Sequence, residues 1–121
     1  MNVRRWRAPL LWAAVILLVS SVPMPAISAP AGTDKWVHAA LYLVLGFLAV
    51  RALLSERTAR VWQLLVLIAV LVAFGGLDEL HQRWIPGRTA DPKDWAADTV
   101  GSTAGLVAGI FRGRRRTARA L

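Results

Sequence analysis

The stretch VWQLLVLIAVLVAFGGL at residues 61–77 decides the fold class, because Gln63 is its only strongly polar side chain. An α-helix of this length rises by roughly 25 Å and nearly crosses the ~30 Å hydrocarbon core of a bilayer. Three further apolar runs occupy residues 9–22, 36–54 and 95–111, and the last of these is rich in small residues. The sequence therefore predicts an all-α fold, a small polytopic membrane bundle of four transmembrane helices.

The composition of the 121-residue chain supports a membrane protein. It is 56% hydrophobic and 18% charged, whereas soluble domains average about 45–50% apolar and 25% charged residues. It contains no cysteine, which excludes a disulfide-stapled module and any cysteine-based metal site. The net charge of +8 raises the question of nucleic-acid binding. No soluble fold with a basic face fits these apolar runs, so we expect no nucleic-acid partner.

Most basic residues form three clusters, which lie before the first apolar run, between the second and third, and after the fourth. The positive-inside rule places such clusters in the cytoplasm. Both termini are therefore expected to be cytoplasmic. The clusters contain Arg4, Arg5 and Arg7, then Arg51, Arg57 and Arg60, and finally Arg112, Arg114, Arg115, Arg116 and Arg119.

The first apolar run allows two interpretations. Its basic start and the small residues at 26–29 are typical of a signal peptide with a cleavage site. The alternative is a retained first helix, which we favour because Ile27 fits the small-residue pattern poorly. Cleavage would leave three helices, with their orientation unchanged.

Ionisable residues gather at the outer ends of the predicted helices, although such groups are costly inside a membrane. The second segment opens with Asp34, Lys35, His38 and Tyr42. The spacing of Asp34, His38 and Tyr42 (i, i+4, i+8) places them on one helical face. The third segment ends with Asp78, Glu79, His81 and Gln82, where Asp-x-x-His spacing can let a carboxylate orient an imidazole or bring two metal ligands together.

A third polar group precedes and enters the fourth segment. Pro86 and Gly87 indicate a turn, and Asp91 before Pro92 is typical of a helix N-cap. Asp98 lies roughly 10 Å deeper than this cap and shares a face with Asp94. A carboxylate at this depth needs a partner, for which the candidates are Arg88 and His38.

Below Asp98, glycine recurs at residues 101, 105 and 109. Small residues at every fourth position let helices pack closely in lipid. We expect the fourth helix to pack tightly there and to hold Asp98 against its neighbours.

The outer ends of these three segments should meet, because the second begins, the third ends and the fourth begins on the same side of the membrane. The candidates for acid–base catalysis are His38, Asp78, His81 and Asp98. The candidates for substrate binding are Asp34, Lys35, Tyr42, Glu79, Gln82, Arg88, Asp91 and Asp94.

At these residues the chain resembles the VanZ-like membrane proteins. That family carries D-K-x-x-H-x-x-x-Y, D-E-x-x-Q-type and P-G-R-x-x-D-x-x-D-x-x-x-D-x-x-G elements. The chain reads DKWVHAALY at 34–42, DELHQ at 78–82 and PGRTADPKDWAADTVG at 86–101. Order and gaps match over residues 34–109. The resemblance implies a small bacterial inner-membrane protein concerned with the cell envelope. The family takes its name from a member associated with resistance to the glycopeptide teicoplanin, and it implies no particular reaction.

Two functions remain open on the sequence alone. In the first, an outer-facing site, enzymatic or not, acts on or binds a lipid-linked or cell-envelope substrate. Arg88 would hold an anionic group, and His38 or His81 would act as acid or base, oriented by Asp78 or Asp98. In the second, the chain is a non-catalytic accessory or partner-binding module, and the polar cluster is a structural hydrogen-bond network. A proton-coupled transporter fits less well, because no ionisable residue interrupts 43–50, 64–77 or 103–111.

Asp and His side chains could also hold a divalent metal such as Mg²⁺, Mn²⁺ or Zn²⁺, although no motif identifies the ligands. The expected partners are the lipid bilayer and a lipid-linked envelope precursor, and the oligomeric state is left open. We divide the chain into a first membrane helix (or signal peptide) with its outer loop at 1–33, a VanZ-like membrane domain at 34–111, and a basic cytoplasmic tail at 112–121.

Overall fold

The computed structural model of the chain describes residues 2–23, 32–55 and 58–121. Within these ranges the regular structure is entirely helical, which confirms the all-α prediction. The elements are η1 (Val3–Trp6), α1 (Arg7–Ser21), α2 (Thr33–Leu53), α3 (Val61–Gln82) and α4 (Pro92–Arg119). The small residues at 26–29 and Arg57, which bear on cleavage and topology, lie outside the described residues.

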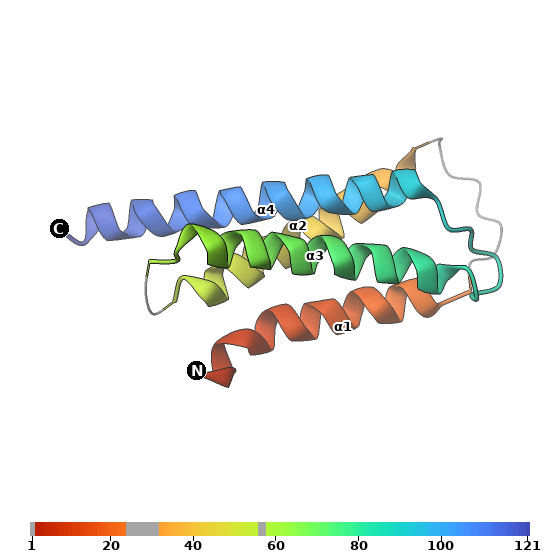
Figure 1. The fold of residues 1–121 in the computed structure, drawn as a ribbon, viewed down its shortest axis with the longest axis horizontal. Coiled ribbons are helices and arrows are strands. Elements are labelled where there is room, and N and C mark those ends of the chain that lie inside the picture. The colour runs from red at the N-terminus through yellow and green to blue at the C-terminus, as the bar shows by residue number, and fades with distance from the viewer. Residues whose placement is uncertain (1, 24–31, 56–57) are drawn as a thin grey trace.

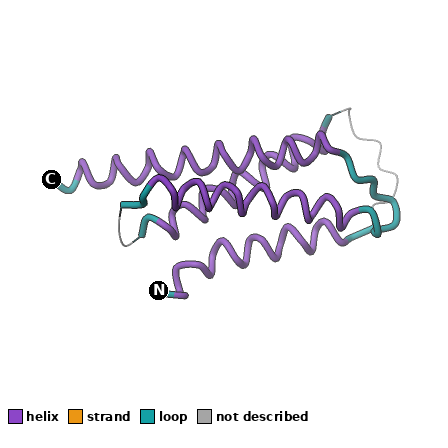
Figure 2. Tube along the Cα trace, viewed as in Figure 1, coloured by secondary structure: helices purple, strands orange, loops and turns teal. Residues whose placement is uncertain are grey.

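The four α-helices lie side by side along one long axis (Figure 1). The N- and C-termini lie at the same end of the bundle. At the other end α1 and α3 finish and α2 and α4 begin, and Figure 2 shows the loop between α3 and α4 there. This antiparallel arrangement brings the polar segments predicted from sequence to one end of the molecule.

Local sequence explains where α4 begins. The Asp91 side chain accepts a hydrogen bond from the Lys93 backbone N–H at 2.9 Å, and Pro92 occupies the first turn. The predicted N-cap is therefore confirmed. Gly87 has φ 77°, a left-handed conformation that glycine adopts without strain, so the predicted turn at 86–87 is also present. At its other end α4 continues through the arginine-rich residues to Arg119.

The closest helix pair is α2 with α4, and it depends on glycine. A Cβ atom at Gly105 would overlap the backbone carbonyl oxygen of Leu43, and one at Gly101 would overlap that of Ala39. Gly46 of α2 approaches the Ser102 backbone in the same way. The close packing predicted from the glycine repeat is therefore confirmed, and it holds the two backbones in direct contact.

The exposed and buried surfaces of the helices suit a lipid environment. A small core is formed by side chains such as Tyr42, Val50 and Leu106. Large apolar side chains remain exposed along α1 and α3, including Leu10, Leu18, Leu65, Val66, Val70 and Leu77. By length and composition α2 and α3 can each cross a membrane. The α1 helix has 15 residues, a rise of roughly 22 Å.

Gly105→Ala is expected to destabilise the protein by about 1–3 kcal/mol, because the new methyl group meets backbone rather than a mobile side chain. Gly113→Ala is the matched control on the same helix, where the nearest atom is the Arg51 side chain at 3.8 Å. Its effect should be neutral or stabilising by up to ~1 kcal/mol. Unfolding of both variants in detergent, compared with the native chain, checks this. Equal unfolding midpoints would contradict the close α2–α4 contact.

Candidate functional site

The polar ends of the four helices form a buried cluster at the end of the bundle opposite the termini. Its members come from all four helices, and His38 and Tyr42 are the members from α2. The buried polar side chains that meet there are Ser20, Asp78, Glu79, Gln82, Asp94 and Asp98. Side chains predicted from three distant segments of sequence therefore do meet.

His38 and Asp98 form the central pair. The His38 Nδ1 atom lies 2.8 Å from Asp98 Oδ1, and the Asp98 side chain is 1% exposed. Gly75 of α3 makes room for this carboxylate, because a Cβ there would lie 3.2 Å from the Asp98 Cβ. Of the two partners expected for Asp98, the structure brings His38 to it.

Asp78 organises a second group, which ties α1 to α2 and α3. Its Oδ2 atom accepts hydrogen bonds from the Tyr42 hydroxyl at 3.0 Å and from the Ser20 hydroxyl at 3.1 Å. Asp78 does not orient His81 as expected from the Asp-x-x-His spacing, because His81 is exposed and its Nε2 lies 3.2 Å from Ser21 Oγ. Ser20 was missed from sequence, since a single hydroxyl in an apolar helix carries no distinctive pattern.

Lys35 links the start of α2 to the start of α4. Its Nζ atom lies 3.2 Å from Asp34, 3.4 Å from Asp91 and 3.2 Å from Asp94. The hydrogen bond from the Lys93 N–H, aided by the Lys35 ammonium group, holds the pKa of Asp91 below its ordinary value. The Asp91 backbone N–H in turn donates to Glu79 Oε1 at 2.6 Å, so the loop before α4 fixes one oxygen of Glu79.

Arg88 has a role that the sequence did not suggest. Its Nε atom donates to the Val22 carbonyl at 3.0 Å and its Nη2 atom to the Val19 carbonyl at 2.8 Å. These carbonyls lie at the C-terminal end of α1, where helical carbonyl groups lack partners within the helix and cations are favoured. Arg88 therefore fastens α1 to the α3–α4 loop, and its guanidinium group is directed to backbone oxygens rather than to Asp98.

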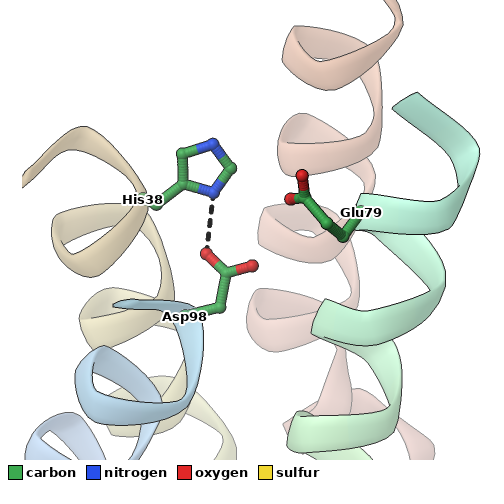
Figure 3. A group of neighbouring side chains, drawn as sticks. All are labelled: His38, Glu79 and Asp98. Atoms are coloured by element: carbon green, nitrogen blue, oxygen red, sulfur yellow. Dashed lines mark hydrogen bonds and ion pairs between the residues drawn. The ribbon is translucent and has the colours of Figure 1, made fainter. Parts of the chain in front are cut away.

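Four buried polar atoms have no hydrogen-bond partner among the described residues: Asp78 Oδ1, Glu79 Oε2, Gln82 Nε2 and Asp98 Oδ2. Such atoms are rare in folded proteins and call for a specific explanation. One possible ligand atom from each of His38, Glu79 and Asp98 lies within 4.8 Å of the others. Figure 3 shows how the three side chains lie. This part of the cluster has free capacity for a ligand.

A protein-family model described as VanZ/LLP1 matches residues 11–112. The chain belongs to this family. The match includes most of α1, which the sequence motifs did not reach, together with all the cluster residues. No curated protein and no solved structure matches the chain. Family membership and the two helices that can cross a bilayer make this a VanZ-like membrane protein.

Ser20→Ala is expected to lower stability by about 1–2 kcal/mol, because it removes one of the two donors to the buried Asp78 carboxylate. Ser21→Ala is the adjacent control. Ser21 is exposed, and its loss should change stability by no more than ~0.5 kcal/mol. Unfolding midpoints of both variants in detergent measure the difference. Equal effects would contradict the docking of α1 through Asp78.

Proposed function

We propose that this VanZ-family protein is a multi-pass protein of the bacterial inner membrane, whose outer-facing polar site binds or acts on a cell-envelope or lipid-linked substrate. The observation that carries the proposal is the set of buried carboxylate oxygens without partners beside the His38–Asp98 pair. A purely structural network would be expected to satisfy its polar atoms, since an unsatisfied buried group costs about 1–3 kcal/mol.

Within this site we assign His38 and Asp98 as the central functional pair, because each is the other's direct partner. Glu79 lies beside them and completes the inner part of the site. Lys35, Asp91 and Asp94 form the rim toward the loop, and the exposed Asp34 lies outside this rim as a partner of Lys35. At the end of α3, His81 is exposed and available to the polar part of a substrate, whereas Gln82 is buried.

The alternative is a non-catalytic accessory module with a structural polar network. The Asp78 group favours it locally, because Tyr42 and Ser20 both bind Asp78 and join three helices. We therefore assign Asp78 and Tyr42 to positioning the helices. Asp78 Oδ1 also lacks a partner, but the substrate-binding role falls to the side of His38, Glu79 and Asp98, where two carboxylates with unpartnered oxygens lie beside an imidazole.

Four membrane crossings, with both termini in the cytoplasm, complete the proposal. The termini lie together, away from the polar site (Figure 1), and the arginine clusters lie at their end. Retention of α1 is supported by its contacts: the Trp12 Nε1–H donates to the Leu41 carbonyl at 2.8 Å, and Arg88 binds its C-terminal end. Residues 34–111 then form the membrane domain, with 1–33 as the first helix and outer loop and 112–121 as the basic end.

The absence of cysteine allows a direct test of this topology. Thr89→Cys, in the exposed α3–α4 loop, should react with a membrane-impermeant maleimide in spheroplasts. Thr117→Cys, exposed near the end of α4, should react only after the membrane is permeabilised. Labelling of both positions in intact spheroplasts would contradict an outer site with a cytoplasmic C-terminus.

The intact mass of the purified protein reports whether α1 is retained.

The substrate proposal is tested by native mass spectrometry of the protein purified from bacterial membranes. The native chain should retain an envelope lipid or lipid-linked precursor, and His38→Gln and Asp98→Asn should lose it while keeping near-native unfolding midpoints. Arg116→Gln, at the opposite end of the bundle, is the control and should keep it. If both site variants retain the lipid and only lose stability, the structural alternative holds.

A change in teicoplanin susceptibility on deletion of the gene tests a link to glycopeptide resistance.

A further inference from the structure

We infer that His38, Glu79 and Asp98 bind a divalent transition-metal ion of the Mn²⁺ or Zn²⁺ type between α2, α3 and α4. The inference deepens the proposed function. It rests on that proposal only in stating that the cation would bind the anionic group of the envelope substrate. The three donor groups come from three different helices, and donor atoms of all three lie within 4.8 Å of one another.

The two carboxylates offer oxygens that nothing else in the described structure uses. Glu79 is 6% exposed and Asp98 is 1% exposed. Glu79 Oε2 and Asp98 Oδ2 are buried without a hydrogen-bond partner. Figure 3 shows the Glu79 carboxylate turned toward His38 and Asp98, with the second Asp98 oxygen facing it. Two buried carboxylates that face each other are strongly unfavourable unless a cation or proton lies between them.

Each donor group is held in place by the surrounding structure. The Asp91 backbone N–H binds the other oxygen of Glu79 at 2.6 Å, which leaves Oε2 free. The His38 Nδ1 atom lies 2.8 Å from Asp98 Oδ1. A cation would bind Nδ1 in place of the proton that these two atoms now share, and the two atoms would then separate to about 3.0–3.4 Å, the spacing of neighbouring ligands with bonds of about 2.0–2.2 Å.

The remaining ring nitrogen of His38 lies near a carboxylate. Its Nε2 atom is 4.0 Å from Asp94 Oδ2, beyond hydrogen-bond distance. Metal-bound histidines commonly direct their second ring nitrogen to a carboxylate, which fixes the ring orientation. Asp94 is itself held by Lys35 at 3.2 Å. Asp94 therefore lies on the correct side of the ring for such a partner, but makes no direct hydrogen bond to it.

The donor set also indicates the class of cation. One imidazole nitrogen with carboxylate oxygens suits Zn²⁺ and Mn²⁺. Ca²⁺ prefers six to eight oxygen ligands, and Mg²⁺ prefers oxygen and retains several waters. With three protein donors, coordination positions are left for water or an oxygen of a substrate, as in catalytic rather than structural zinc sites.

A cation would reconcile this acidic site with an anionic substrate. Arg88 is engaged with α1 carbonyls and Lys35 with three carboxylates. Neither side chain is free to neutralise Glu79 and Asp98. A phosphate group approaching these carboxylates would be repelled, whereas a metal ion held by them attracts it.

The test uses the full chain in detergent, stripped with EDTA and titrated with Zn²⁺ by calorimetry and with Mn²⁺ by electron paramagnetic resonance. We expect a single ion per chain. Glu79→Gln and Asp98→Asn should each weaken binding by about tenfold or more, since loss of even an outer-shell partner has effects of about this size. Asp34→Asn removes the same charge at the same end of the bundle, from a side chain that is 55% exposed, and should leave the affinity unchanged.

The inference is overturned if the chain does not bind one metal ion per molecule. It is also overturned if Asp34→Asn and Glu79→Gln lose metal affinity equally, because that would indicate a general attraction of cations to acidic residues. If Asp98→Asn does not fold, Glu79→Gln decides, together with the visible absorption of bound Co²⁺ in the native chain. Lipid retention measured in EDTA separates the two proposals. Lipid retained without metal binding overturns only the metal site, and metal bound without lipid overturns only the substrate proposal.

Discussion

The direct backbone contact between α2 and α4 is the constraint on which the polar site depends. Glycines at positions 46, 101 and 105 let the two helices approach until carbonyl oxygens occupy the space of absent side chains. His38 and Asp98 lie at the outer end of this contact, one on each helix. A wider separation of the two helices would move the short Asp98 side chain away from the imidazole that it now meets at 2.8 Å. The packing of the apolar segments therefore sets the geometry of the ionisable pair.

The cluster has two parts, which differ in how their carboxylates are held, although each part keeps a carboxylate oxygen without a partner. Around Asp78, hydroxyl groups of α1 and α2 donate to one carboxylate oxygen, which stabilises the docking of α1. Around His38, Glu79 and Asp98, each residue has one good contact and the carboxylates keep a free oxygen. In a low-dielectric interior, unmade hydrogen bonds cost more than in water. Free oxygens are thus more easily explained by a ligand than by packing.

Features that depend on neighbouring residues could be predicted from the sequence, whereas features that depend on contacts between distant segments could not. The cap at Asp91 followed from the Asp-Pro order, and the tight helix pair from the glycine repeat. The sequence left two candidate partners for Asp98, Arg88 and His38. It could not decide between them, because the position of Arg88 depends on the path of the loop before α4. The role of Arg88 was missed because its acceptors are backbone carbonyls, which no sequence pattern reveals.

Basic and acidic side chains are concentrated at opposite ends of the bundle, and this separation affects how the buried carboxylates are neutralised. The chain carries +8 overall, yet Asp78, Glu79, Asp94 and Asp98 are buried at its polar end, where His38 and Lys35 are the basic partners among the described residues. Most of the described arginines lie at the opposite end, too far away to compensate inside a low-dielectric bundle, and Arg88 is engaged with carbonyls of α1. An excess of buried carboxylates must then be balanced locally, by protons or by a bound cation. Of these, a cation also explains why the free oxygens converge from two helices on the imidazole of a third.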